Sequence, residues 1–313
     1  MLRAGVDIGG TDIKIGLIDD LDMKFKAKTI IPFTYDGYET VVAKTAEKIK
    51  ELLKETGGEL SSIGLAVPGS IDIEKGVVIH AHNLNYHSTP IVSEMKKHFP
   101  DLPVLIGNDA DCAALGEFCC GAFRGYDTAV ILTLGTGVGG GIICKGKLFS
   151  GGRKNGVELG HMMLKYGGIK CSCGNLGCVE SYCTATWIIN EGRKVIEAGR
   201  DSLIVKRSEG DLEKVDAKLV IDCAKEGDFE AKAIFDIFVD NLSAAITSIN
   251  ACLDPEIMAL GGGVSKAGDF LFTPLREKVR EKSFFKIDYN IVQAQLGNDA
   301  GTVGACMLFR NGE

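Results

Sequence analysis

The sequence predicts an α/β protein with two domains, and three observations support this prediction. Two pairs of apolar strands are each joined by a glycine-rich turn, at 9–12 and again at 135–141. Stretches with helical apolar spacing alternate with buried strands along the chain. A length of 313 residues suits one large or two medium domains. We expect a small domain of 1–110 plus 299–313 and a large domain of 111–298.

The composition is that of an ordinary soluble globular protein, with 45% hydrophobic and 25% charged residues. A net charge of -7 argues against nucleic acid or an anionic membrane surface as a partner. The N-terminus lacks the apolar segment of a signal peptide, and no run of about 18 apolar residues could span a bilayer. Eleven cysteines, with Cys119 and Cys120 adjacent, favour reduced thiols over a disulfide framework. These features predict a cytoplasmic protein.

An antiparallel meander opens the chain, with strands expected at 2–8, 13–19 and 25–31. The turn Gly9-Gly10-Thr11 offers backbone N–H groups to a phosphate, and Asp7 ends the first strand, where a carboxylate can hold a hydrated cation. A plain type I′ hairpin turn explains the glycines nearly as well.

A helix is expected over 37–56, followed by a buried strand that ends at Pro68-Gly69 and by a short hairpin. The next stretch, HAHNLNYHSTP, reads as irregular. Its histidines His80, His82 and His87 have no carboxylate or cysteine partners at metal-ligand spacing, which favours solvated side chains over a metal site. Asn83 is better placed to bond a polar ligand.

A helix over 90–98 and a strand over 104–106 lead to Gly107-Asn108-Asp109, where another helix begins. Carboxylates at the carboxyl ends of strands lie in the crevice where open α/β sheets bind ligands. Asp109 is therefore a candidate catalytic group. The alternative is that Asp109 only caps the helix, a role worth about 1 kcal/mol.

The strand at 128–134 runs directly into GTGVGGG and out into another strand. This is neither a Walker A motif nor a dinucleotide fingerprint, because the glycines do not open a helix. It predicts a strand-turn-strand phosphate loop that repeats the design of the opening hairpin. One phosphate hairpin per domain is the layout of the actin-like ATPase (ribonuclease H-like) fold, with two α/β domains and a cleft between them.

Four metal-ligand residues, His161, Cys171, Cys173 and Cys178, fall within 18 residues, a pattern that suits one tetrahedral zinc ion. Gly174 and Gly177 let the backbone fold back between the last two cysteines. The alternative is a set of ordinary buried cysteines. The carboxylates Glu158 and Glu180 flank this segment, where they either bind ligand hydroxyls or are solvated charges.

The C-terminal half is mainly helical, with helices expected at 187–198, 217–225, 229–252 and up to 309, and strands at 257–263 and 289–294. The glycines Gly261, Gly262 and Gly263 follow a strand, where they could wrap adenosine. The apolar stripe of the helix at 229–252 is either a homodimer surface or entirely core.

Together these motifs resemble the ROK family of sugar kinases and sugar-responsive repressors, over essentially the full chain. The motifs DIGGT, PG, NL, NDA, GTGVGGG, ELGH and CxCGxxGCxE occur in the order that the family shows. The glucokinase members are the most similar. Asp12 stands where lysine is frequent, and Tyr86 stands where the family often has tryptophan.

The resemblance implies that Asp109 is the catalytic base of a phosphoryl transfer and that the metal is structural zinc held by His161, Cys171, Cys173 and Cys178. The substrate-binding residues expected on the same basis are Gly69, Asn83, Asn108, Asp109, Glu158, His161 and Glu180. The residues expected to bind ATP and Mg²⁺ are Asp7, Gly9, Gly10, Thr11, Gly135, Thr136, Gly137, Gly139, Gly261, Gly262 and Gly263.

We therefore expect an ATP-dependent hexokinase that phosphorylates the 6-hydroxyl of glucose and forms a homodimer. Another hexose or N-acetylhexosamine is the alternative substrate: N-acetylmannosamine, N-acetylglucosamine, allose or fructose. A DNA-binding repressor is disfavoured because the first strand starts at residue 2, which leaves no room for a helix-turn-helix ahead of it. An inactive sugar-binding module is disfavoured because neither Asp109 nor a phosphate loop is missing.

Overall fold

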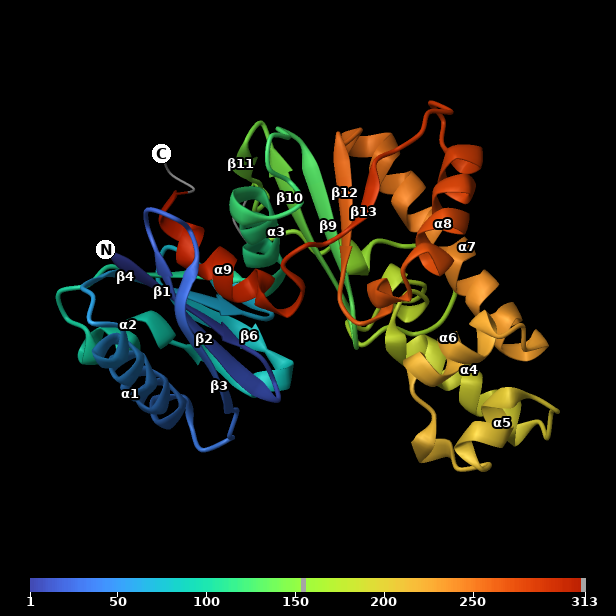
Figure 1. The fold of residues 1–313 in the computed structure, drawn as a ribbon, viewed down its shortest axis with the longest axis horizontal. Helices are drawn as coiled ribbons and strands as arrows, with labels where there is room; N and C mark the ends of the chain where they lie inside the picture. Colours follow the sequence, from blue (N-terminus) through green and yellow to red (C-terminus); the bar gives the residue numbers. More distant parts are fainter. Residues whose placement is uncertain (153–155, 311–313) are drawn as a thin grey trace. The chain divides into compact units, whose positions relative to one another are not determined.

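A computed structural model describes residues 1–152 and 156–310 and divides the chain into two compact units (Figure 1). The first unit comprises Met1–Ile131, Gly141–Val157 and Ala294–Glu313, and the second comprises Leu132–Gly140 and Glu158–Gln293. Asp109 falls in the first unit and the cysteine cluster in the second. The domain boundaries expected from the sequence stay a prediction.

The first unit is built on a five-stranded sheet in the order β3-β2-β1-β4-β8 and a three-stranded sheet in the order β5-β6-β7. The strands are β1 (Leu2–Ile8), β2 (Asp12–Asp19), β3 (Phe25–Pro32), β4 (Leu60–Val67), β5 (Ser70–Asp72), β6 (Val77–Ala81), β7 (Tyr86–Thr89) and β8 (Val104–Asn108). The antiparallel meander β1-β2-β3 is confirmed, and β4 and β8 continue the sheet in parallel with β1. The helices are α1 (Tyr38–Thr56), α2 (Ile91–His98), α3 (Asp109–Cys120) and α9 (Ala300–Met307), with short 3-10 turns η1 (His82–Leu84), η6 (Gly297–Asp299) and η7 (Leu308–Arg310).

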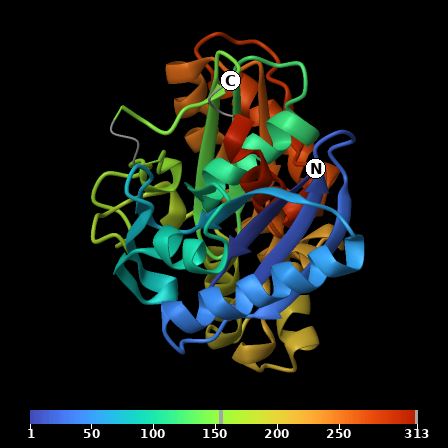
Figure 2. The same ribbon diagram turned by 90° about the vertical axis from the view of Figure 1, so that its left-hand side faces the viewer.

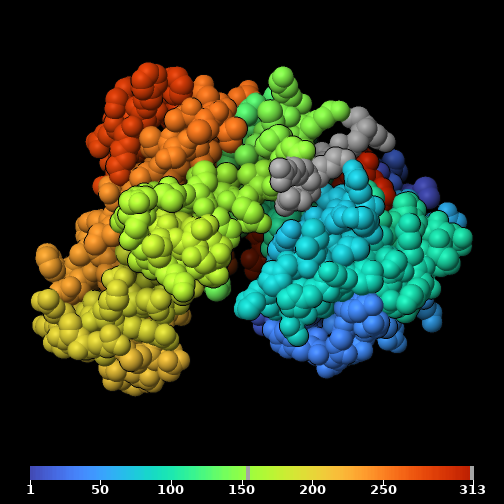
Figure 3. Space-filling model, turned by 180° about the vertical axis from the view of Figure 1, so that it is seen from behind, coloured from blue at the N-terminus to red at the C-terminus, as the bar shows by residue number. Residues whose placement is uncertain are grey.

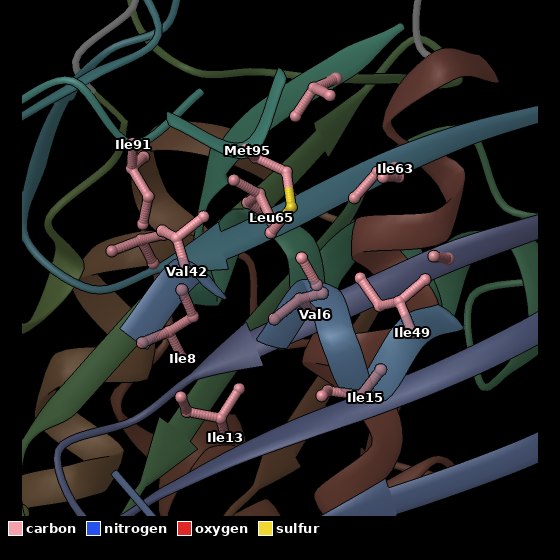
Figure 4. Packing of buried hydrophobic residues seen from close by; sticks show 14 of the residues in the cluster. Val6, Ile8, Ile13, Ile15, Val42, Ile49, Ile63, Leu65, Ile91 and Met95 are labelled. Carbon is pink, nitrogen blue, oxygen red and sulfur yellow. The ribbon is translucent and has the colours of Figure 1, made fainter. Parts of the chain in front are cut away.

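One face of the first sheet packs against α1, which crosses in front of the strands in Figure 2. Alternate residues of the strands point to this face because side chains in a strand have a period of two. Val6 and Ile15 meet Val42 and Ile49 of α1 in a core that excludes water (Figure 4). Each such side chain contributes about 1.5–3 kcal/mol by leaving water.

The opposite face of the sheet is lined with glycine instead. Gly16, Gly5 and Gly64 lie in register on three neighbouring strands. A Cβ on Gly5 or Gly64 would collide with backbone carbonyls of α9, at Thr302 and Ala305 respectively. The glycines therefore let this short helix lie directly on the sheet, which fixes where the N-terminus of α9 points.

The second sheet has the order β11-β10-β9-β12-β13. Its strands are β9 (Ala129–Leu134), β10 (Val138–Cys144), β11 (Lys147–Leu148), β12 (Ile257–Gly261) and β13 (Ile291–Gln293). The helices of the second unit are α4 (Ala185–Glu197), α5 (Leu203–Ser208), α6 (Ala217–Lys225), α7 (Phe229–Leu253) and α8 (Asp269–Lys282), and its 3-10 turns are η2 (Leu159–His161), η3 (Val179–Ser181), η4 (Leu212–Lys214) and η5 (Val264–Ala267). Neither α5 nor α8 is predicted from the sequence. In α8, Pro274 lies inside the helix, a position that disfavours a helix prediction.

The prediction that the stretch after His80 is irregular is wrong. It completes β6, turns through η1 and returns as β7, antiparallel to β6. Strand β7 has only four residues, buried at both ends and exposed at the two central positions, and so short a segment without alternation cannot be distinguished from a loop in the sequence alone.

No helix among residues 1–152 and 156–310 combines the length and hydropathy that crossing a membrane requires.

Candidate active site

Asp109 lies where β8 ends and α3 begins. Asn108 is the N-cap of α3, and its Oδ1 accepts hydrogen bonds from the backbone N–H groups of Ala110 at 2.9 Å and Asp111 at 3.3 Å. Asp109 is the first helical residue, and its own Oδ1 accepts from the Ala110 N–H at 2.8 Å. The alternative that Asp109 is the helix cap is therefore wrong, since Asn108 has that role.

Asn108 also joins the helix start to Gly69. Its Nδ2 donates to the Gly69 carbonyl oxygen at 3.2 Å, so both ends of the amide are engaged within the protein. Gly69 has a φ of 88°, and a Cβ there would collide with the carbonyl oxygen of His80 in β6. Only glycine fits this position, which brings the end of β4 against the β6-β7 hairpin.

Asn83 lies at the tip of that hairpin, in η1, and its side chain is exposed. The Tyr35 hydroxyl donates to the Asn83 carbonyl oxygen at 3.1 Å. On the other side, a Cβ added to Gly10 would lie 3.2 Å from the same oxygen. The first unit thus brings the glycine turn and the predicted sugar-binding residue Asn83 into contact.

The turn after β1 is closed by a hydrogen bond from the Gly9 N–H to the Asp12 carbonyl oxygen at 2.8 Å. Neither Gly9 nor Gly10 has a positive φ, so the type I′ turn considered from the sequence is wrong. The lack of a side chain at Gly10 instead eases the close approach to Asn83.

Asp7 faces the α9 side of the sheet. Burial raises the pKa of its carboxyl, while the ammonium of Lys14 opposes that shift from 3.2 Å. A Cβ on Gly301, in the first turn of α9, would lie 2.9 Å from the Asp7 carboxyl carbon. Lys14 was not predicted, although it stands directly opposite Asp7 in the β1-β2 register.

The second glycine turn, between β9 and β10, is held by α4. The Gly135 N–H donates to the Gly137 carbonyl oxygen at 3.0 Å, and the Ala185 N–H donates to the Gly135 carbonyl oxygen at 2.8 Å. The Thr186 hydroxyl donates to the Thr136 carbonyl oxygen at 3.2 Å. These contacts of α4 are not predicted from the sequence, because nothing local links 185–186 to the turn.

The residues His161, Cys171, Cys173 and Cys178 form one cluster, with ligand atoms within 4.8 Å of one another. The Cys173 and Cys178 sulfurs are 3.7 Å apart, and the Cys171 sulfur is 3.6 Å from His161 Nδ1. Tetrahedral zinc, with Zn–S near 2.3 Å and Zn–N near 2.0–2.1 Å, requires about 3.8 Å and about 3.6 Å for these separations. The four side chains therefore fit one zinc ion.

The backbone of this cluster, which we call the knuckle (residues 161–178), folds back as expected from its glycines. Gly174 and Gly177 have φ of 93° and 83°, and a Cβ on Gly177 would collide with the Lys165 carbonyl oxygen. The knuckle lies at the surface of its unit, where it appears yellow-green in Figure 3.

Glu180 joins the knuckle to the second glycine turn. Its Oε1 accepts from the Ser172 hydroxyl at 3.1 Å and is 3.7 Å from the Cys171 sulfur. Its Oε2 accepts from the Val138 N–H at 3.1 Å. A Cβ on Gly137 would lie 2.7 Å from that same oxygen, so the turn approaches Glu180 closely.

Glu158 and His161 share the 3-10 turn η2, through a hydrogen bond from the His161 N–H to the Glu158 carbonyl oxygen at 3.0 Å. Glu158 is the N-cap of this turn, and its backbone angles are not helical. The backbone of Glu158 is thus joined to His161, and the side chain of Glu180 contacts Ser172 of the knuckle.

The third glycine cluster has mainly a packing role. Gly262 has a φ of 80°, and a Cβ there would collide with the backbone of Leu134 in β9. Gly261 is buried in β12, whereas a Cβ on Gly263 would meet nothing within 4 Å. Among these residues, Gly263 alone leaves open space for a ligand.

Comparisons with known proteins show what the chain as a whole is similar to. The ROK family model matches residues 3–312. A glucokinase from Thermotoga maritima is 39% identical over 309 residues, covering 98% of this chain and 96% of that protein. The crystal structure of a ROK family glucokinase from Streptomyces griseus, in complex with glucose and AMPPNP, has a TM-score of 0.83 at 28% identity and covers 98% of this chain and 99% of that one. A xylose repressor from Caldicellulosiruptor bescii is 26% identical over 323 residues, which span 98% of this chain and 79% of the repressor.

Proposed function

Because the chain belongs to the ROK family, we propose that it is an ATP-dependent sugar kinase that phosphorylates the 6-hydroxyl of glucose. The observation that carries this proposal is the similarity, over nearly the whole chain, to proteins named glucokinase, one of them bound to glucose and AMPPNP. The residues that such chemistry needs are present: a strand-end carboxylate, two glycine turns and a set of polar groups beside the knuckle.

In this proposal Asp109 is the general base. It accepts the proton of the 6-hydroxyl while the hydroxyl oxygen attacks the γ-phosphorus in line. The cap made by Asn108 and its bond to Gly69 hold the strand end in place, so Asp109 needs little reorganisation when the sugar binds.

The two glycine turns are the proposed phosphate-binding elements. The proposed residues are Gly9, Gly10 and Thr11 in one turn and Gly135 to Gly139 in the other, where glycine keeps the backbone accessible. The N–H groups of Gly9, Gly135 and Val138 donate within the protein, so the other N–H groups of the two turns would bind the phosphates. Asp7 would hold Mg²⁺ through its waters, and the ion would neutralise charge that develops on the phosphates.

For the knuckle we propose structural zinc, supported by the fit of its four ligand atoms to tetrahedral geometry. The ion would supply no chemistry; it would fix His161 directly and Glu180 through Cys171 and Ser172. These groups and Glu158 are the proposed ligands of the sugar hydroxyls.

A coupled assay tests the proposal, by comparing kcat/KM for glucose with that for fructose, allose, N-acetylglucosamine and N-acetylmannosamine, with ATP and Mg²⁺. An acetamido group at C2 needs a cavity that a hydroxyl does not. A hexosamine preferred tenfold or more would overturn the choice of glucose but retain the kinase. If no sugar is phosphorylated, a sugar-responsive regulator becomes the better proposal.

The base is tested separately with Asp109→Asn, which keeps the shape of the side chain and removes its proton affinity. We expect kcat to fall by about 10²–10⁴, the usual range for loss of a general base. Asp101→Asn, on an exposed loop carboxylate, is the control and should leave kcat unchanged. Wild-type turnover in the Asp109 variant would rule out its catalytic role.

We also propose a cytoplasmic homodimer. Helix α7 buries most of its apolar stripe but leaves Phe229 83% and Ile237 51% exposed, so part of the helix surface is available for a second copy. Sedimentation at micromolar concentration would remove this proposal if only monomer were found.

A further inference from the structure

Two histidines face each other across the β6-β7 hairpin. His80 and His87 are directly paired in the antiparallel register, and both side chains are exposed. Their Nδ1 atoms are 3.2 Å apart, and their ring centroids are 4.8 Å apart. His82, beyond the end of β6, is the next imidazole, with its ring centroid 6.2 Å from that of His80.

This separation suits a bound metal ion. With metal–nitrogen distances of about 2.0–2.1 Å and tetrahedral angles, two imidazole nitrogens on one ion lie about 3.3 Å apart. Directly opposite residues of an antiparallel pair are fixed by the backbone ladder, so the two rings meet without rearrangement of the strands. Without an ion, the same two atoms can share one hydrogen bond between a donor and an acceptor tautomer.

We propose that His80 and His87 bind one divalent transition-metal ion of the zinc class through their Nδ1 atoms, with water completing its coordination. Neutral imidazole is a preferred ligand of such ions. The knuckle is the only group of three or more ligands within reach of one another in the described part of the chain, so His82 is not counted as a ligand. The knuckle belongs to the other unit, and the histidine pair is a separate site.

The histidine pair lies on the hairpin that carries Asn83, so a bound ion should affect sugar binding. The His80 carbonyl oxygen packs against Gly69, whose own carbonyl accepts from Asn108. The tip of the same hairpin carries Asn83. An ion that joins β6 to β7 would restrict the motion of the hairpin tip with Asn83 and of the segment around Gly69. Restricting a ligand-binding segment in its bound conformation favours binding. We therefore expect the ion to lower the KM for sugar and leave kcat unchanged, a step that rests on the proposed function.

The site itself is tested by counting metal, which does not depend on activity. Full-length protein is equilibrated with Zn²⁺, freed of unbound ion by gel filtration and analysed for zinc per chain. We expect two ions in the wild type and one, held by the knuckle, in both His80→Gln and His87→Gln. His98→Gln, at the C-terminal end of α2, is the matched control and should keep two ions.

A second measurement identifies the ligands in the wild-type protein. The chain has only five histidines, so their imidazole signals can be assigned in a nitrogen-15 spectrum. Adding Ni²⁺ in small amounts to zinc-loaded protein should broaden the signals of His80 and His87 before those of His98. One zinc per chain in every protein, with no selective broadening of this pair, would overturn the proposal.

The outcomes separate the site from the proposed function. Two ions in the wild type and one in His87→Gln support the metal site even if no sugar is phosphorylated. A metal count as expected, with a KM that is the same in wild type and His87→Gln, would remove the coupling to Asn83 and retain the site.

Discussion

The two glycine turns look alike in the sequence but are held in different ways. The turn after β1 lies beside a buried carboxylate, Asp7, which forms an ion pair with Lys14 at 3.2 Å. The turn after β9 has its Val138 N–H bonded to Glu180, which also contacts the knuckle. The first turn is closed by its own backbone beside a local charge, and the second is held by a distant segment of the chain.

This difference explains why the two turns should respond to different changes. Replacing Asp7 alters charge beside the first turn without loosening its backbone. Disturbing the knuckle should alter the second turn without any change in the turn's own residues, because Glu180 carries the connection.

Among the changes that distinguish the two turns, Asp7→Asn should reduce turnover most. The change keeps the shape of the side chain but removes the charge proposed to hold Mg²⁺, and charge stabilisation by a metal is worth several kcal/mol, so kcat should fall by about 100-fold. Steady-state kinetics at saturating ATP and sugar measures it. Asp12→Asn, a more exposed carboxylate at the same turn, is the control. Equal losses in both variants would contradict a specific role for Asp7.

Cys173→Ser should reduce activity by about tenfold or more, because loss of the ion removes the support of the groups around it. Cys173 is exposed, so the change creates no cavity in the core. Zinc content and kcat/KM are measured together, with the exposed Cys252→Ser as the matched control. Full activity in a zinc-free Cys173 variant would show that the knuckle does not support the site.

Glu180→Gln should loosen the second turn. A hydrogen bond to a charged acceptor exceeds a neutral one by about 1 kcal/mol, which corresponds to an approximately fivefold change in the opening equilibrium. Hydrogen exchange of the Val138 amide should therefore become about fivefold faster, with exchange around Gly9 and Gly10 unchanged. Glu197→Gln, on the exposed end of α4, serves as the control. Unchanged exchange at Val138 would show that Glu180 does not hold the turn.

The smallest expected effect is the pH dependence of stability that Asp7 contributes. Burial raises its pKa in the folded protein, so its contribution is fully present below its ordinary pKa near 3.8 and is lost as pH rises through the raised value. Asp7→Asn should therefore become more stable relative to the wild type as pH rises through that window. Denaturant unfolding at several pH values measures the difference in free energy of unfolding between the two proteins. A difference that does not change with pH would contradict the raised pKa of Asp7.

Much of the fold could be read from local patterns. The meander, α1 and α7 follow from apolar residues with a period of two or of 3.6, which depend only on neighbours in the chain. The order of the motifs predicted the family and the actin-like ATPase fold, and the match over residues 3–312 and the solved relatives confirm both. Helix α8 was not predicted, because a proline inside a segment argues against a helix more strongly than apolar spacing argues for one.

The types and spacing of a few residues also predicted the chemistry of the candidate site. Four zinc-type ligands within 18 residues identify a possible metal cluster, and a carboxylate after a buried strand identifies a possible base. These inferences need no long-range contact. They predict which groups are available but not which partners each group has.

Those partners were decided by the tertiary structure. Glu180 and Val138 are 42 positions apart, and Asn108 and Gly69 are 39 apart, so no local pattern could link them. The pairing of His80 with His87 required the hairpin register, which a short half-buried strand does not reveal. Sequence by itself determined the elements and the reactive groups because both depend on local composition. Only the tertiary structure decided which groups meet, because packing and strand register are properties of the whole chain.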